Sequence, residues 1–170
     1  MIKETTGLIS LIPENIPEEL TERPQWVCWR LEEREGEPTK VLYTPGTRSR
    51  ASSTDLMTWR TFEDALEAYE ASEPMAYDGV GFVFCSADPF VGVDLDDCRD
   101  PETGEVAAWA RRIIDATQEG HAEVSPSGTG IHIIVAGKVR EGGIKKKIPG
   151  KGKVEMYSRE RFFTITGKVL

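Results

Sequence analysis

Two aspartates separated by one residue stand near the end of a strand-like segment at residues 90–97. Side chains of an extended strand alternate between its two faces, so Asp94 and Asp96 point the same way and their apolar neighbours point the other way. Like charges this close repel and push one carboxyl group toward its neutral form. A divalent cation removes that penalty, and Mg²⁺ prefers carboxylate oxygens. The pair indicates a metal site; the alternative is an acidic strand end that runs into a turn.

A loop rich in glycine and hydroxyl side chains follows at residues 125–130. Its glycines let backbone N–H groups converge and its hydroxyl groups add donors, a composition suited to phosphate oxygens. His132 lies on the next strand, where it could bind a phosphate or a metal. A glycine- and serine-rich turn before a structural histidine is the common alternative. The residues that this pattern nominates for phosphate binding are Ser125, Ser127, Gly128, Gly130 and His132.

A third carboxylate stands alone on a later strand-like segment at residues 153–157. Val154 and Met156 are expected to face the core, so Glu155 shares the opposite face with Lys153 and Tyr157. If this strand is a sheet neighbour of residues 90–97, Glu155 completes a trio with the two aspartates. The alternative is a surface glutamate paired with a lysine, which is the commoner fate of glutamate.

The charge of the chain is distributed unevenly. Its net charge is −8, yet residues 138–153, here called the basic segment, hold seven basic residues against one acidic residue and carry +6. Such a local concentration can hold a nucleic-acid backbone on an otherwise acidic body. The alternative is a solvated, flexible loop, which its four glycines favour. The lysines nominated for DNA contact are Lys145, Lys146, Lys147 and Lys151.

The three cysteines are Cys28, Cys85 and Cys98, and they form no Cys-x-x-Cys pair. Their odd number indicates reduced thiols and predicts a cytoplasmic protein. The longest apolar runs are too short to cross a bilayer, and the first residues lack the apolar core of a secretory signal. No membrane partner is therefore expected.

The elements that must position these residues are mostly strands. With 170 residues the chain is expected to form one domain. Residues 78–86 and 90–97 are expected to pair as an antiparallel hairpin across a tight turn. Helices are predicted near residues 61–71 and 106–118, and further strands at 25–31, 40–43, 122–125, 131–135, 153–157 and 161–166. This pattern predicts an α+β fold with a mainly antiparallel sheet.

The order of the three chemical motifs resembles that of the archaeo-eukaryotic primase superfamily, and in particular the primase-polymerase domains of phage and plasmid replication proteins. The resemblance runs from residues 26–29 to residues 161–167 and so covers nearly the whole chain. It implies Asp94, Asp96 and Glu155 as metal ligands and places them, with His132, among the catalytic residues. Arg161 is implied as a further nucleotide contact. Many members carry Ser-x-His in the second motif, whereas Ser127 here lies five residues before the histidine.

The resemblance also implies a fold and a function. The expected fold is an RRM-like palm at about residues 78–170 that carries the site and packs against an N-terminal α/β module at about residues 1–77. Together they would form one catalytic domain, 1–170, at the N-terminal end of a longer protein with an accessory or helicase region. The implied activity is template-directed DNA priming and primer extension. Its substrates would be nucleoside triphosphates, its partner a DNA template with its primer, and its cofactors two Mg²⁺ or Mn²⁺ ions.

Two other functions use similar features. A two-metal nuclease or relaxase could employ the same carboxylates, but a relaxase needs a His-x-His cluster and the one other histidine is His121. A non-catalytic RRM-like module that binds nucleic acid would favour solvent-facing aromatic residues on adjacent strands and would not need three carboxylates in this arrangement.

Overall fold

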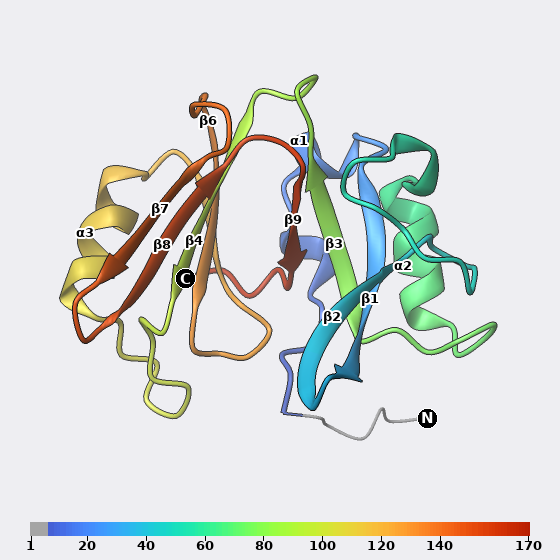
Figure 1. Ribbon diagram of the computed structural model, residues 1–170, viewed down its shortest axis with the longest axis horizontal. Helices are drawn as coiled ribbons and strands as arrows, with labels where there is room; N and C mark the ends of the chain where they lie inside the picture. The colour runs from blue at the N-terminus through green and yellow to red at the C-terminus, as the bar shows by residue number, and fades with distance from the viewer. Residues whose placement is uncertain (1–6) are drawn as a thin grey trace.

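The computed structural model describes residues 7–170 and consists of two antiparallel β-sheets with few helices (Figure 1). The first sheet has the strand order β2-β1-β3-β9, and the second has the order β5-β6-β4-β8-β7. The first comprises β1 (Trp26–Arg34), β2 (Glu37–Tyr43), β3 (Gly79–Phe84) and β9 (Arg161–Ile165). The second comprises β4 (Phe90–Asp96), β5 (His121–Val124), β6 (Ile131–Ala136), β7 (Ile144–Ile148) and β8 (Gly152–Tyr157).

Helices cover the outer sides of the sheets, α2 beside the first and α3 beside the second (Figure 1). Thr61 caps α2 (Phe62–Glu70), because its hydroxyl oxygen accepts a hydrogen bond from the N–H of Asp64 at 3.2 Å. The α3 helix (Ala108–Ala116) packs on the apolar face of β4. The shorter helices are η1 (Pro13–Asn15), α1 (Glu18–Thr21) and η2 (Leu56–Thr58).

The second sheet follows an RRM-like path for most of its length. The chain runs from β4 through α3 to β5, leaving room for β6 between the two strands, and β8 then pairs with the other edge of β4. An RRM carries a second helix before its last strand. Here β7 stands in that place and pairs with β8 at the sheet edge. The predicted α+β palm-like fold is therefore confirmed, with an edge strand where the basic segment was expected to form a loop.

The predicted hairpin between residues 78–86 and 90–97 is wrong. The strands β3 and β4 lie in different sheets, since β3 pairs with β1 and β9 while β4 pairs with β6 and β8. At the turn between them, the Asp88 carboxylate accepts hydrogen bonds from the N–H groups of Cys85 and Phe90. The turn thus carries the chain from one sheet to the other. As a result, the first sheet combines β1 and β2 with two strands from beyond residue 77.

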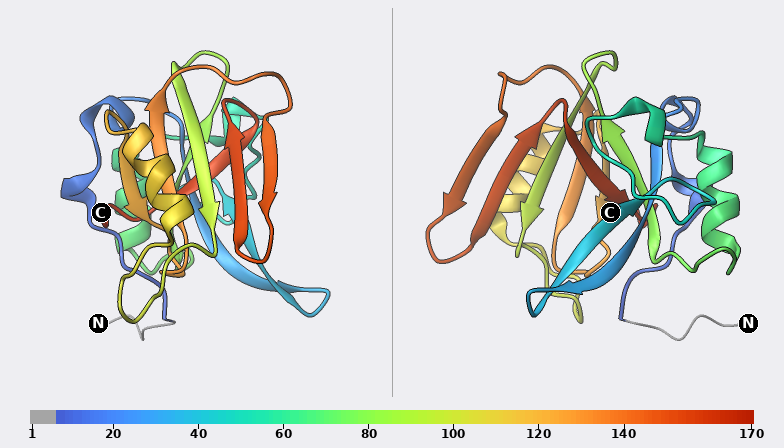
Figure 2. Two further views of the ribbon diagram at one scale, coloured as in Figure 1. Left: turned by 90° about the vertical axis from the view of Figure 1, so that its left-hand side faces the viewer. Right: turned by 45° about the vertical axis from the view of Figure 1, so that its right-hand side comes forward.

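The two sheets meet where β9 approaches β4 and β6. Gly92 faces the rings of Phe163 and Phe84, and a Cβ atom at this glycine would lie only 2.6 Å from the Phe163 ring. The His132 ring stacks on Phe163 with centroids 4.7 Å apart. Figure 2 shows the two sheets from further directions, with the tip of the β1–β2 hairpin projecting beyond them. The contact at Gly92 therefore sets how closely the sheets approach beside the aspartate pair.

Within residues 7–170, the structure has no helix that combines the length and the apolar character needed to cross a membrane.

Replacing Gly92 with Ala should destabilise the protein by about 1–3 kcal/mol, because the added methyl group must displace a packed phenylalanine ring. Gly137→Ala is the matched control, since a Cβ atom there would meet only Val91, at an ordinary contact distance of 3.6 Å. Urea unfolding of both variants measures the difference. Equal stabilities for the two variants would show that the sheets do not depend on this contact.

Candidate active site

Three of the predicted site residues form a row across the second sheet. Asp94 on β4 is paired in register with His132 on β6 and with Glu155 on β8. Side chains of directly opposed residues lie on the same face of a sheet and touch one another. The expectation that the strand of Glu155 neighbours the aspartate strand is confirmed. All three residues line one pocket between the two sheets.

His132 is held in a single orientation. Its Nδ1 lies 2.9 Å from the carbonyl oxygen of Thr164 on β9. Because a carbonyl oxygen only accepts hydrogen bonds, Nδ1 carries the proton. This hydrogen bond and the stacking on Phe163 leave Nε2 3.5 Å from Oδ1 of Asp94. The histidine therefore joins the two sheets and presents one ring nitrogen to the carboxylates.

Asp94 carries a buried oxygen that needs a partner. Among residues 7–170, its Oδ1 atom accepts no hydrogen bond. Burial raises the pKa of Asp94 against the opposing effect of His132, and the charges of Asp96 and Glu155 raise that pKa further. The buried hydroxyl of Thr164, another residue of the same pocket, also has no partner within the described chain. Unpaired buried polar atoms are costly, so their presence in one pocket favours a ligand there.

Lysine side chains neutralise the other two carboxylates. The Lys153 ammonium lies 3.0 Å from Oδ2 of Asp96 and 3.1 Å from Oε1 of Glu155, and Lys145 lies 3.6 Å from the same Glu155 oxygen. Partial burial acts to raise the pKa of Glu155, but hydrogen bonds from Tyr157 and Lys153 outweigh it and lower that pKa.

The three carboxylates are of the chemical type that binds a divalent metal ion, but their side chains are not oriented toward a common centre. Three carboxylates on one sheet face, one with an unpartnered oxygen, are the hard oxygen donors that Mg²⁺ and Mn²⁺ bind. In the conformations seen across residues 7–170, however, no three Asp, Glu, His or Cys side chains are arranged to hold a metal ion. Asp96 and Glu155 are both turned to the Lys153 ammonium. Metal binding therefore requires these side chains to regroup.

The loop at residues 125–130 lies beside the end of β4 and does not line the pocket of Asp94. The N–H groups of Cys98 and Arg99 both donate to the carbonyl oxygen of Thr129. The hydroxyl groups of the loop bond to one another, with 3.2 Å between Ser125 and Ser127 and 2.9 Å between Ser127 and Thr129. The predicted phosphate loop thus adjoins the strand end that carries Asp96, and its hydroxyl groups are already engaged.

Both glycines of this loop have structural reasons to be there. Gly128 has a positive φ of 80°, which disfavours other residues. A Cβ atom at Gly130 would lie 3.0 Å from the carbonyl oxygen of Leu95. Their presence is explained by the turn and by the close approach of β4, so the glycines alone carry no argument for phosphate binding.

Two basic side chains line the pocket together with the carboxylate row. Arg161, predicted as a nucleotide contact, lies at the start of β9 with its guanidinium 4.8 Å from the centre of the Tyr157 ring. Lys40, from β2 of the other sheet, was not nominated by sequence reasoning. Burial lowers the pKa of Lys40, and the charges of Asp94 and Asp96 oppose that effect. Because side chains alternate along β2, Lys40 points away from the face that buries Val41. The local sequence does not indicate that this second face of β2 looks toward the second sheet.

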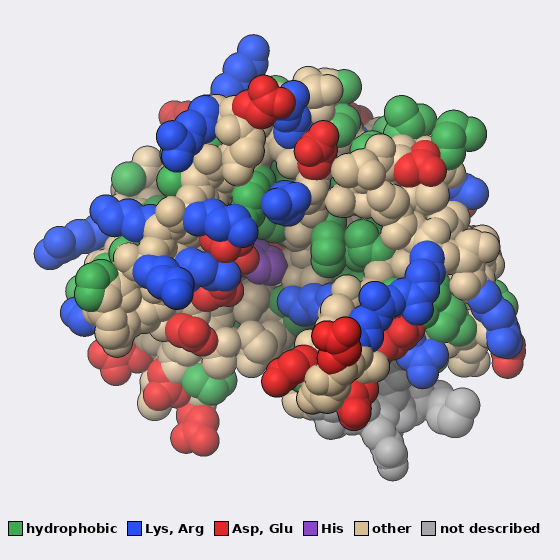
Figure 3. All heavy atoms as spheres, in the orientation of Figure 1, with side chains coloured by type: hydrophobic (Ala, Val, Ile, Leu, Met, Phe, Trp, Pro, Cys, Tyr) green, Lys and Arg blue, Asp and Glu red, His purple; other side chains and the backbone are tan. Residues whose placement is uncertain are grey.

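The basic segment presents its lysines on two different faces. Lys145 and Lys147 are paired with Glu155 and Lys153 and so lie on the face of the carboxylate row, whereas Lys146 is paired with the core residue Val154. Lys151 lies in the exposed turn between β7 and β8. Figure 3 shows basic side chains gathered around acidic side chains and a histidine on this face of the molecule.

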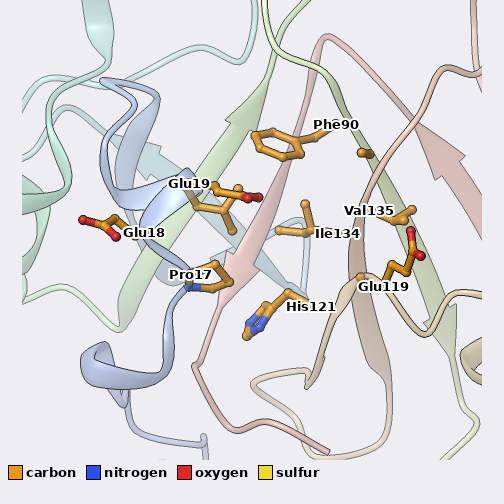
Figure 4. Close-up of a pocket in the computed structure, with 11 residues that line it drawn as sticks. Pro17, Glu18, Glu19, Phe90, Glu119, His121, Ile134 and Val135 are labelled. Carbon is orange, nitrogen blue, oxygen red and sulfur yellow. The ribbon is translucent and has the colours of Figure 1, made fainter.

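The other histidine belongs to a different place. His121 lines a pocket between α1 and the far end of the second sheet, beside Phe90 and Ile134 (Figure 4). Its Nε2 lies 2.9 Å from Oε2 of Glu123, a fully buried carboxylate that also accepts the N–H groups of Thr166 and Gly167. His121 therefore supports the packing of the chain end, and no paired-histidine centre of the relaxase type forms with His132.

Comparison with known proteins finds a similar phage protein. No family model matches the chain. The chain is 36% identical over 154 residues, or 88% of its length, to a protein named DNA primase-polymerase from Nitratiruptor phage NrS-1. It spans about a fifth (20%) of the length of that protein. The similarity confirms the predicted resemblance to primase-polymerases of phages.

Proposed function

We propose that this chain is the catalytic domain of a template-directed DNA primase-polymerase, which transfers nucleotides from (d)NTPs to a 3′-hydroxyl group. The observation that carries the proposal is the row of His132, Asp94 and Glu155 across three neighbouring strands. A pocket that also holds Lys40 and Arg161 surrounds this row, so that clustered acidic groups face basic ones. Nucleotidyl transfer needs this combination, because cations and a polyanionic substrate must meet in one place.

The metal ligands in this proposal are Asp94, Asp96 and Glu155, which would hold two Mg²⁺ or Mn²⁺ ions. Such ions would favour ionisation of the attacking hydroxyl group and would neutralise charge on the leaving pyrophosphate. Oδ1 of Asp94 supports the assignment, because it is buried, accepts no hydrogen bond from residues 7–170 and has His132 Nε2 only at 3.5 Å, so a cation would satisfy it. Asp94 is central to the row, because it is paired in register with His132 on one side and with Glu155 on the other.

The triphosphate would be held by His132 and Arg161, with Lys40 as an addition from the first sheet. Because Nδ1 of His132 already donates to Thr164, Nε2 must gain a proton before it can donate to a phosphate oxygen. Arg161 supplies a planar donor suited to two phosphate oxygens. Further phosphate contacts would come from the loop residues Ser125, Ser127, Gly128 and Gly130. For this, the loop hydroxyl groups would have to exchange their hydrogen bonds to one another for hydrogen bonds to phosphate oxygens.

DNA would lie along the face that carries the carboxylate row. Lys145 and Lys147 share that face and would contact phosphates of the template or primer. Lys151 in the adjoining turn extends the same basic edge. The body of the protein is acidic, so positive charge on this face directs a polyanion toward the site. Lys146 points to the opposite side of the sheet and is removed from the direct contacts in this proposal.

Substituting Asn for Asp94 or Gln for Glu155 should reduce nucleotide incorporation by at least about a thousandfold, because each change removes a charged ligand. The assay measures extension of a primed template with labelled dNTPs and Mn²⁺. Asp97→Asn is the matched control, since Asp97 is exposed and lies just beyond β4. Near wild-type extension by the Asp94 variant would refute the site. If the wild-type protein degrades the primer, the two-metal nuclease is the better assignment. If it binds DNA but neither extends nor degrades the primer, the non-catalytic nucleic-acid-binding module is the better assignment.

The two-sided arrangement of the basic segment predicts unequal effects of its lysines. Replacing Lys145 and Lys147 together with Ala should weaken single-stranded DNA binding and lower the log–log salt slope by roughly 1.4, about 0.7 for each phosphate contact. Lys146→Ala removes one positive charge from the other face and should leave the slope nearly unchanged. Fluorescence anisotropy at several salt concentrations measures both. Equal loss per lysine on the two faces would show that the segment acts only as a diffuse charge.

A further inference from the structure

A lysine side chain holds two of the proposed metal ligands together. Lys153 lies on β8, two residues before Glu155 and opposite Asp96 in register. Its ammonium is 3.0 Å from the Asp96 carboxylate and 3.1 Å from the Glu155 carboxylate. These distances are those of charge-assisted hydrogen bonds to both groups. One positive charge thus bridges two carboxylates that would otherwise repel each other.

The same oxygen atoms cannot serve Lys153 and a metal ion at once. A divalent ion needs carboxylate oxygens at about 2.1 Å, turned toward a common centre. Asp96 and Glu155 are instead turned toward the ammonium, while Asp94, the third carboxylate, has a buried oxygen with no hydrogen-bond partner in residues 7–170. Of the three carboxylates, Asp94 therefore has an oxygen free to bind a cation, whereas Asp96 and Glu155 are engaged in ion pairs with Lys153.

Lys153 has room to leave. The Lys153 side chain is 38% exposed to solvent, and the side chain of its partner Asp96 is 40% exposed. The four-carbon stem of lysine is flexible, and the ammonium gains hydration when it moves into water. The neighbouring strand presents Lys147 opposite Lys153, and this second positive charge disfavours a shift toward β7. Withdrawal toward the solvent or toward a bound phosphate is the open path.

We propose that Lys153 is an internal counter-ion that competes with the divalent cations for Asp96 and Glu155 and withdraws when they bind. The inference rests on the proposed function, because it takes these carboxylates as the metal ligands. It explains how three clustered carboxylates are tolerated in the metal-free protein. It also makes metal affinity a balance between the cation and the protein's own lysine, and it releases one ammonium group beside the substrate phosphates when the ions enter.

Mn²⁺ binding to protein stripped with EDTA tests the proposal without any turnover. Electron paramagnetic resonance measures the free ion during titration of wild type, Lys153→Met and Lys153→Arg. The methionine variant should bind Mn²⁺ at least about tenfold more tightly, because a competing charge in contact with the ligands is gone. The arginine variant keeps the charge and should stay closer to wild type. Lys146→Met, on the opposite face of β7, removes a charge with no ion pair to any described residue and should change the affinity less than about threefold.

Unchanged or weaker Mn²⁺ binding by Lys153→Met would overturn the proposal. Thermal unfolding in EDTA checks that this variant is folded, and Lys153→Gln replaces it if the exposed methionine causes aggregation. Asp94→Asn separates the two hypotheses. If it abolishes Mn²⁺ binding while the lysine variants match wild type, the metal site stands and only the role of Lys153 fails. If wild type binds Mn²⁺ no better than Asp94→Asn, the metal site of the proposed function fails together with the inference.

Discussion

The packing of Phe163 against Gly92 and His132 is the contact on which the candidate site depends. Gly92 lacks a side chain, so the Phe163 ring can lie directly on the second sheet, 4.7 Å from the centre of the His132 ring. The same approach brings the Thr164 carbonyl to Nδ1 of His132. Without it the carboxylate row would lie on an open sheet face. With it the row lies in a pocket between two sheets, and Lys40 and Arg161 enter from the first sheet.

Charge balance within this pocket follows from the strand register. The row His132–Asp94–Glu155–Lys145 and the row Asp96–Lys153–Lys147 both run across the sheet. The two aspartates lie on the central strand β4, Glu155 and Lys153 lie on β8, and the remaining lysines of the two rows lie on the edge strand β7, so positive charge increases toward the edge. A chain with a net charge of −8 can thereby present a basic border around an acidic centre. That order suits cations at the centre and phosphates around it.

Sequence patterns predicted the arrangement of the three carboxylates better than the sheets that hold them. Strand alternation correctly placed Asp94, Asp96 and Glu155 on one face, because period-two burial is a local property. The predicted hairpin of β3 and β4 was wrong, because tertiary packing decides which strands pair. The strand β9 begins 77 residues after β3 ends, yet it pairs with β3. Lys40 was missed for the same reason. The opposite faces of Lys145 and Lys146 were missed because no strand was predicted at residues 144–148. Glycines at residues 128 and 130 suggested phosphate binding, yet backbone geometry already accounts for them.

Locating the bound ions tests the central claim most directly. Crystals grown with Mn²⁺ and a nucleoside triphosphate, with data collected at the manganese absorption edge, reveal the ions by anomalous scattering independently of any assay. The account predicts peaks at about 2.1 Å from carboxylate oxygens of Asp94, with Asp96 and Glu155 turned toward them. Peaks confined to other carboxylates, such as those beside His121, with Asp94 unliganded, would contradict it.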